Sequence, residues 1–212
     1  MLDGLRSGGV DDARVLEAMA RVPREEFVAE GYEAAAYADR ALPIGYGQTI
    51  SQPLMVAHML QALELRTGEC VLDIGTGSGY QAALLRAMGA EVVSVERLHR
   101  LAASARRRLE RLGFAVEVLV GDGSTGAGGR QFDAVVCAAV APHPPPSLVG
   151  ALAPGGRLVI PLRDRAGERD ERLYRLRRPP AGAADDAVTV EDLGPCRFVL
   201  LVGREGYPPD DA

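Results

Sequence analysis

Val71-Leu-Asp-Ile-Gly-Thr-Gly-Ser-Gly-Tyr80 marks the junction between a predicted strand and a predicted helix. The stretch begins as an apolar run, which is typical of a buried strand, and passes through three glycines into a helical pattern. Glycines let the backbone turn tightly and approach a ligand without a Cβ in the way. In an open α/β sheet, ligands lie beyond the carboxyl ends of the strands, where the winding reverses. The stretch therefore predicts a ligand site.

Outward from this junction, strand and helix patterns alternate along the chain. Strands are predicted at Cys70–Ile74, Val92–Val95, Val116–Val120, Ala134–Cys137 and Leu158–Ile160, and helices at Tyr80–Met88, Leu98–Leu112 and Ser147–Leu152. Alternation of this kind implies right-handed crossovers and an open sheet. We therefore predict an α/β fold with a doubly wound, mostly parallel sheet of the Rossmann-like type.

The residues before the sheet are predicted to form an N-terminal helical extension. A helix that Asp11 or Asp12 can cap ends at Pro23, and a short second helix follows it. The glycine-rich segment 42–53 is predicted to be extended, and a further helix starts at its end and runs to about Leu63. These elements precede the junction and place an extended loop beside it.

The residues after the parallel strands are predicted to complete one domain. Leu173–Leu176 and Phe198–Val202 are predicted to close the sheet as an edge pair, and Gly206–Ala212 to form a loose tail. We predict a single domain over residues 1–212. Its parts are the N-terminal helices and loop (1–66), the ligand-binding core (67–162), the closing strands (163–205) and the tail (206–212).

The composition excludes several classes of protein. The net charge of −5 argues against a nucleic-acid binder, which needs a basic excess to neutralise phosphates. Cys70, Cys137 and Cys196 lie in separate apolar stretches, which favours buried reduced thiols over disulfides or metal ligands. The N-terminus lacks a signal-peptide pattern, and no apolar stretch is long enough to span a bilayer. We therefore expect a cytoplasmic protein with no metal site, nucleic-acid partner or membrane partner.

The glycine spacing selects the class of ligand. A dinucleotide fingerprint, G-x-G-x-x-G counted from Gly75, would place its third glycine on Tyr80, so that pattern fails. The observed G-x-G-x-G follows an acid, Asp73, which would repel a pyrophosphate. S-adenosylmethionine has no phosphate and carries an ammonium and a sulfonium, so a nearby acid is favourable. The junction therefore predicts S-adenosylmethionine as the cofactor.

Two further acids end the next two predicted strands. Glu96 can accept both ribose hydroxyls, and Asp122 can accept the adenine amino group. Each acid alone could be only an exposed residue at a strand end, but acids at three successive strand ends favour a shared ligand. The predicted cofactor-binding residues are Asp73, Gly75, Thr76, Gly77, Ser78, Gly79, Glu96, Arg97, Asp122 and Gly123.

The loop before the junction carries a resemblance to a known family. Leu42-Pro-Ile-Gly-Tyr-Gly-Gln-Thr-Ile-Ser-Gln-Pro53, followed by the glycine junction, closely resembles the protein-L-isoaspartate O-methyltransferases. The likeness continues through Arg21-Val-Pro-Arg-Glu-Glu-Phe27, Ser94-Val-Glu-Arg97, Gly121-Asp-Gly123, Pro154-Gly-Gly-Arg-Leu-Val-Ile-Pro161 and Arg197-Phe-Val199. It covers nearly the whole chain in order, and the run from Gly47 to Pro53 is its most specific part.

The resemblance implies a repair reaction. A methyl group passes to the α-carboxylate of an L-isoaspartyl residue in a damaged protein or peptide, and the ester cyclises to a succinimide that can reopen to aspartate. The active-site serine of the family matches Ser51. Substrate contacts are expected from Thr49, Ile50, Gln52 and Arg197. The expected partners are isoaspartyl proteins or peptides, and the expected state is a monomer.

The residue chemistry is consistent with this reaction. A free carboxylate is ionised at neutral pH, so methyl transfer to it requires no general base and depends on positioning and on exclusion of water. Ser51 precedes a predicted helix start, where unpaired N–H groups and the helix dipole favour an anion. The hydroxyls of Thr49 and Ser51 could add hydrogen bonds. The alternative is that Ser51 only caps the helix.

Three other functions are compatible with parts of the pattern. The acceptor could be an ordinary aspartate in a dedicated peptide, or the chain could be a non-catalytic S-adenosylmethionine-binding module. Nucleic-acid base methylation is disfavoured because the expected Asn-Pro-Pro-Tyr-like run is replaced by Cys137-Ala-Ala-Val-Ala-Pro-His143. Departures from the family at Cys137, Leu200 and the small-residue loop Ser124–Gly129 leave the exact substrate preference open.

Overall fold

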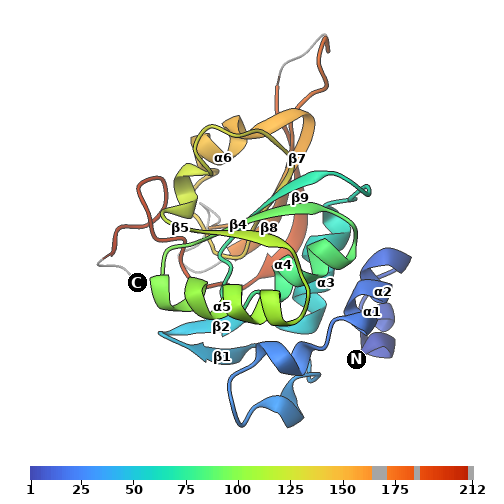
Figure 1. The fold of residues 1–212 in the computed structure, drawn as a ribbon. Helices are drawn as coiled ribbons and strands as arrows, with labels where there is room; N and C mark the ends of the chain where they lie inside the picture. The colour runs from blue at the N-terminus through green and yellow to red at the C-terminus, as the bar shows by residue number, and fades with distance from the viewer. Residues whose placement is uncertain (164–170, 184–186, 210–212) are drawn as a thin grey trace.

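The computed structural model describes residues 1–163, 171–183 and 187–209. Within these ranges a seven-stranded sheet has the order β5-β4-β3-β6-β7-β8-β9 (Figure 1). The strands are β3 (Cys70–Ile74), β4 (Glu91–Glu96), β5 (Val116–Val120), β6 (Phe132–Cys137), β7 (Leu152–Arg163), β8 (Glu171–Arg177) and β9 (Thr189–Cys196). Pairing is parallel from β5 to β7 and antiparallel for β8 and β9. The predicted doubly wound, mostly parallel fold is confirmed.

Helices cover both faces of the sheet. The α-helices are α1 (Leu2–Ser7), α2 (Ala13–Arg21), α3 (Pro53–Ala62), α4 (Tyr80–Ala87), α5 (His99–Arg111) and α6 (Pro146–Gly150), with short 3₁₀ turns at Arg24–Phe27, Glu33–Ala35 and Gly123–Thr125. Alternate strand residues point to opposite faces. Val71 and Val136 pack with α1 to α5, whereas Leu72 and Val135 pack with α6 and with Leu201 from the C-terminal segment.

The order of the strands reverses between β3 and β6. From β3 the chain moves to β4 and then β5 on one side, and it returns to β6 on the other side. The N–H of Gly75 donates to the carbonyl of Val95, and the N–H of Ala138 donates to that of Ile74. The topological switch point therefore lies at the carboxyl ends of β3 and β6, where open α/β sheets bind their ligands.

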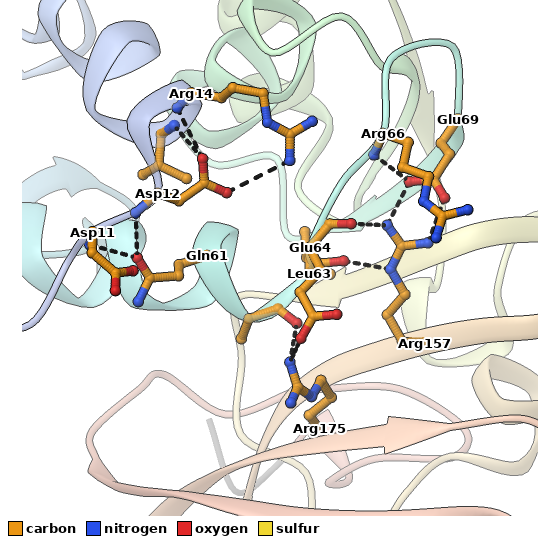
Figure 2. A network of polar contacts seen from close by, with 12 residues as sticks. Asp11, Asp12, Arg14, Gln61, Leu63, Glu64, Arg66, Glu69, Arg157 and Arg175 are labelled. Carbon is orange, nitrogen blue, oxygen red and sulfur yellow. Dashed lines mark hydrogen bonds and ion pairs between the residues drawn. The ribbon is translucent and has the colours of Figure 1, made fainter.

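The N-terminal helices are tied to α3 by polar contacts (Figure 2). Asp12 caps α2 because its carboxylate accepts from the N–H groups of Arg14 and Val15, as the sequence predicts for Asp11 or Asp12. The side-chain Oε1 of Gln61 accepts from the N–H groups of Asp11 and Asp12 at 2.8 and 2.9 Å. These contacts fix the helical extension against the body of the protein.

A buried arginine organises the edge of the sheet that lies opposite the carboxyl ends of the strands. Arg157, near the start of the parallel part of β7, donates to the carbonyls of Leu63 and Glu64 and forms an ion pair with Glu69 (Figure 2). It also donates to the carbonyl of Asp133. The N–H groups of its guanidinium therefore donate to acceptors at the end of α3, in the following loop and in the sheet. This cluster is structural and lies away from the strand ends that receive the ligand.

One of the two strands predicted to pair at the end of the sheet is wrong. β8 pairs with β9 at Thr189–Cys196, not with Phe198–Val202. Residues Phe198–Val202 are apolar because they cover the carboxyl edge of the sheet. There the N–H of Val140 donates to Val199, the N–H of Leu201 donates to Val140, and an isolated bridge joins Val140 to Leu200. Burial against the parallel strands produces the same apolar pattern as an edge strand.

The predicted loose tail is wrong for its first residues. The N–H of Tyr207 donates to the carbonyl of Leu201 at 2.7 Å, and the Tyr207 carbonyl accepts from the N–H of Gly203 at 3.0 Å. The guanidinium of Arg163 lies over the Tyr207 ring, 5.0 Å from its centre. Residues 210–212 of the predicted tail lie outside the described residues. Among those described, no helix combines the length and apolar character needed to cross a membrane.

Candidate active site

A hollow of about 600 Å³, partly open to solvent, lies at the carboxyl edge of the sheet. Strand ends contribute Ile74, Gly75, Gly77, Val95, Glu96, Arg97, Gly123, Ala138 and Ala139 to its walls. The loop before α3 contributes Gln48, Thr49 and Ser51, and the C-terminal segment contributes Val199, Leu200, Leu201 and Val202. Segments from the whole length of the chain therefore meet at the switch point.

The glycine junction forms one wall of this hollow. Gly75 and Gly77 have φ values of 90° and 54°, in the left-handed region that favours glycine. A Cβ added at Gly77 would also lie 3.3 Å from Cδ1 of Ile44, on the loop before α3. Thr76 and Ser78 are buried and line a smaller adjoining hollow of about 330 Å³. The predicted glycine turn is thus where the sequence places it.

Glu96 connects the end of β4 to the glycine turn. Its Oε2 accepts from the N–H of Gly77 and its Oε1 accepts from the N–H of Leu98, both at 2.9 Å. The side chain is buried, so Glu96 is not simply an exposed acid at a strand end. Each carboxylate oxygen keeps a further lone pair. Glu96 therefore holds the turn and can still accept hydrogen bonds from a ligand in the hollow.

Asp73 lies beneath the glycine turn and does not line either hollow. Its carboxylate is fully buried and accepts from Gln81 Nε2 at 2.8 Å and Ser94 Oγ at 2.7 Å. Ser94 Oγ is also 2.5 Å from Thr76 Oγ1, which extends the chain of contacts into the turn. Burial raises the pKa of Asp73 to about 6, although the two hydrogen bonds oppose the rise. The structure thus makes Asp73 a support of the turn.

Asp122 joins the end of β5 to two other segments. Its Oδ1 accepts from the N–H and the hydroxyl of Ser124, at 2.9 and 2.7 Å, and its Oδ2 accepts from the N–H of Arg204 at 2.7 Å. Burial alone would raise the pKa of Asp122, but these hydrogen bonds outweigh it and the pKa is lowered. Of about four lone-pair sites on a carboxylate, three are used and one stays free, although Asp122 itself lines neither hollow. Gly123, its neighbour, lines the hollow.

Ser51 lies where the two hollows meet. It follows a hairpin of β1 (Leu42–Gly45) and β2 (Gln48–Ile50), and both Thr49 and Ser51 line both hollows. Ile50 lines only the smaller hollow. Ser51 is therefore positioned between the space beside the strand ends and the space beside the glycine turn.

The start of α3 differs from the expected anion site. Pro53 at the first turn has no N–H, and the N–H of Leu54 donates to Oδ1 of Asp39 at 2.9 Å. Gln52 is the N-cap residue but makes no side-chain cap. Asp39 thus supplies the cap and uses one of the N–H groups at the start of the helix. The alternative that Ser51 caps the helix is therefore wrong, whereas binding of the acceptor anion near this helix start stays a prediction.

The remaining predicted residues lie at different distances from the site. Arg97 is exposed at the rim of the larger hollow. Gln52 and Arg197 line neither hollow, and Arg197 is exposed. Residues 199–202 form a wall that sequence reasoning assigned to an edge strand. Their apolar run was the available signal, but it does not distinguish a strand from a cover over a ligand site.

The chemistry of Cys137 weighs against a nucleophilic role. Its thiol is fully buried, and its Sγ lies 3.3 Å from the carbonyl of Ala139. Burial raises the pKa of Cys137 to about 12, so the reactive thiolate is disfavoured at neutral pH. Within the described ranges, no group of three or more His, Cys, Asp or Glu side chains is arranged to hold a metal ion.

Known proteins show similarity along almost the full chain. The family model described as "Protein-L-isoaspartate(D-aspartate) O-methyltransferase" matches residues 1–206. Proteins named protein-L-isoaspartate O-methyltransferase from Koribacter versatilis and Aeropyrum pernix are each 48% identical over 97% of this chain, which is 90% and 78% of their own lengths.

Two solved structures also superimpose on nearly all of the chain. One is titled protein-L-isoaspartate O-methyltransferase, with a TM-score of 0.84 and 27% identity, over 97% of this chain and 66% of that one. The other is a putative protein-L-isoaspartate O-methyltransferase from Plasmodium falciparum in complex with S-adenosyl-L-homocysteine. Its TM-score is 0.77 at 25% identity, over 93% of this chain and 94% of that one.

Proposed function

Because this chain belongs to the protein-L-isoaspartate O-methyltransferase family, we propose that it methylates the α-carboxylate of L-isoaspartyl residues in damaged proteins or peptides, with S-adenosylmethionine as donor. The methyl ester cyclises to a succinimide, which can reopen to normal aspartate. One observation carries the proposal for this chain. Ser51 and the glycine turn line the same hollow, so a loop suited to the acceptor faces the turn suited to the donor.

The larger hollow fits the donor. When bound, S-adenosylmethionine supplies a methyl group on a positively charged sulfur. Glu96, in the lining, keeps free lone pairs that suit the ribose hydroxyls. Asp122 is the neighbour of the lining residue Gly123 and keeps one lone pair that suits the adenine amino group. Ile74, Val95 and Leu201 provide apolar surface in the same hollow. The turn itself is held in shape from beneath by Asp73.

The acceptor side depends on positioning alone. An α-carboxyl group has a pKa near 3.5, so it is ionised at neutral pH and needs no base to attack the methyl carbon. Charge disappears as the anion meets the cationic sulfur, so enclosure that removes water favours the reaction. Thr49 and Ser51 can donate hydroxyl hydrogen bonds that hold one carboxylate oxygen while the other faces the methyl group.

Transfer of labelled methyl from S-adenosylmethionine to an isoaspartyl peptide tests the proposal, with the matched aspartyl peptide as control. Label is expected on the isoaspartyl peptide alone, and base treatment should release it as the ester cyclises. Label on the aspartyl peptide would support the dedicated-peptide alternative. Tight cofactor binding with no label on either peptide would instead support a non-catalytic binding module.

We further propose that the protein acts as a cytoplasmic monomer on protein or peptide substrates rather than on nucleic acid. The thiols of Cys70, Cys137 and Cys196 are all free, as in a reducing compartment. The net charge of −5 disfavours binding to phosphates. Sedimentation at micromolar concentration would give the mass of one 22.4 kDa chain if the monomer is correct.

A further inference from the structure

Arg24 is a buried cation directly behind the acceptor loop. Its side chain has no exposed surface. Its Nε donates to the carbonyl of Ala36 and its Nη2 donates to the carbonyl of Ser51, both at 2.7 Å. The guanidinium also lies over the Tyr80 ring, 4.9 Å from the ring centre. Arg24 therefore contacts two residues, Ser51 and Tyr80, that line the smaller hollow.

The charge of Arg24 is not neutralised within the described part of the chain. No carboxylate there lies within ion-pair distance of it, and Asp39 acts on it only at longer range. Its buried Nη1 has no hydrogen-bond partner among those residues. Burial lowers the pKa of Arg24, but arginine remains protonated in proteins. A buried charge without a counter-ion is costly, so the unpartnered cation points to an anion in the working complex.

The hollow in front of Arg24 has no charge of its own. Its lining side chains are all neutral: Thr49, Ile50, Ser51, Val56, Gly75, Thr76, Gly77, Ser78, Tyr80, Gln81 and Ala138. The start of α3, which could have attracted an anion, is already capped by the carboxylate of Asp39. Of the groups packed against this hollow, Arg24 thus supplies the positive charge that a carboxylate would need.

We propose that Arg24 is a positioning residue for methyl transfer. Its fork holds the carbonyl of Ser51 and ties it to Ala36, which fixes the Ser51 hydroxyl at the hollow. Its buried charge stabilises the acceptor carboxylate across Ser51 and Tyr80. This inference rests on the proposed function, since it assigns the anion to the isoaspartyl substrate.

The test compares Arg24 with the other buried, carbonyl-bonded arginine of the fold. Arg24→Met removes the charge and the donors but keeps much of the stem, and Arg24→Lys keeps the charge but loses the planar fork. Arg157→Met is the matched control, because Arg157 bonds carbonyls at the opposite edge of the sheet (Figure 2). Each variant is measured for KM and kcat with an isoaspartyl peptide, for Kd of S-adenosylhomocysteine and for thermal unfolding.

Arg24→Met is expected to lower kcat/KM about 10- to 100-fold, mainly through KM, which is the range for loss of one charge-assisted hydrogen bond. The kcat/KM of Arg24→Lys is expected to lie between those of Arg24→Met and the wild type. The Kd of S-adenosylhomocysteine should stay within about two-fold, and Arg157→Met should lose stability without a change in KM.

If Arg24 had a purely structural role, Arg24→Met would resemble Arg157→Met. Its midpoint of thermal unfolding would be lower, but its KM would equal that of the wild type. That result would overturn the inference. Should Arg24→Met fail to fold, Arg24→Lys decides, because a KM equal to that of the wild type would also overturn it. A wild type that transfers no methyl group to the peptide would remove the proposed function and the inference together, so the two failures are distinguishable.

Discussion

Oδ2 of Asp122 accepts a hydrogen bond from the N–H of Arg204 at 2.7 Å, which joins the end of β5 to a segment 82 residues later in the chain. The neighbouring Glu205 strengthens the connection. Its N–H donates to Ser124 Oγ, and its carboxylate accepts from the N–H and the hydroxyl of Ser147. We call residues 199–207 the strap. Because residues 199–202 line the larger hollow, these anchors hold part of its wall in place.

Gly203→Ala is expected to displace the strap. A Cβ at this position would lie 2.0 Å from Oδ1 of Asp122 and 2.6 Å from Oγ of Ser124, so the strap or the carboxylate must move. We expect the Kd of S-adenosylhomocysteine to rise about ten-fold or more, as for loss of a hydrogen bond to a charged group. Calorimetric titration measures it. Gly150→Ala, where a Cβ meets no atom within 4 Å, is the control, and equal Kd values for both variants would contradict the role of the strap.

Ser51→Ala is expected to reduce turnover without loss of stability. The Ser51 hydroxyl has no hydrogen bond to the described residues that its removal would break. If it holds the acceptor carboxylate, kcat/KM for an isoaspartyl peptide should fall about 10- to 100-fold. Asp39→Ala is the complementary variant. Since Asp39 caps α3, its loss should lower the free energy of unfolding by about 1 kcal/mol.

These two variants separate the role of Ser51 from that of the helix cap. Chemical denaturation and steady-state kinetics on the same samples are sufficient. Unchanged kinetics in Ser51→Ala would show that the hydroxyl does not contact the acceptor, whatever the stability of Asp39→Ala.

Glu96→Gln is expected to weaken cofactor binding. An amide presents one oxygen and one NH₂ group where the carboxylate accepts from Gly77 and Leu98, so one backbone N–H loses its acceptor. We expect the Kd of S-adenosylhomocysteine to rise about 10- to 100-fold. Glu91→Gln, at the exposed start of the same strand, makes the same substitution away from the hollow. A similar effect in both variants would argue against a ligand contact at Glu96.

Asp73→Asn is expected to change how stability depends on pH. The pKa of Asp73 is raised from 3.8 to about 6, so the folded state binds its proton more tightly than the unfolded state. Its contribution to stability is therefore full below about pH 4 and is lost as pH rises through about 6. This rise in pKa corresponds to a free energy of about 3 kcal/mol that disfavours the ionised form of Asp73 in the folded state.

The measurement is the free energy of unfolding of the cofactor-free protein between pH 4 and 8, for wild type and Asp73→Asn. Other acids, such as Glu69, have lowered pKa values and give the opposite slope, although burial itself acts to raise them. They are common to both proteins and cancel in the difference. The advantage of the variant should grow from pH 4 to 7, and a constant difference would show that Asp73 does not titrate in this range.

Local patterns in the sequence predicted most of the sheet and the glycine turn. The apolar runs of β3, β4, β5 and β6 are short and are separated by helical or glycine-rich segments, so their positions follow from spacing. Prediction failed where one pattern fits two structures. The run Phe198–Val202 is apolar because it covers a ligand site, and no periodicity distinguishes that from an edge strand.

The sequence by itself determined the strand–helix alternation, the glycines at the junction and the acids at the ends of three strands, because each is set by neighbours in the chain. Only the tertiary structure decided that Asp73 lies beneath the turn, that Asp39 occupies the start of α3 and that Arg24 lies behind Ser51. Those placements depend on contacts between segments far apart in sequence, and burial then determines whether a charge meets a ligand or supports the backbone that does.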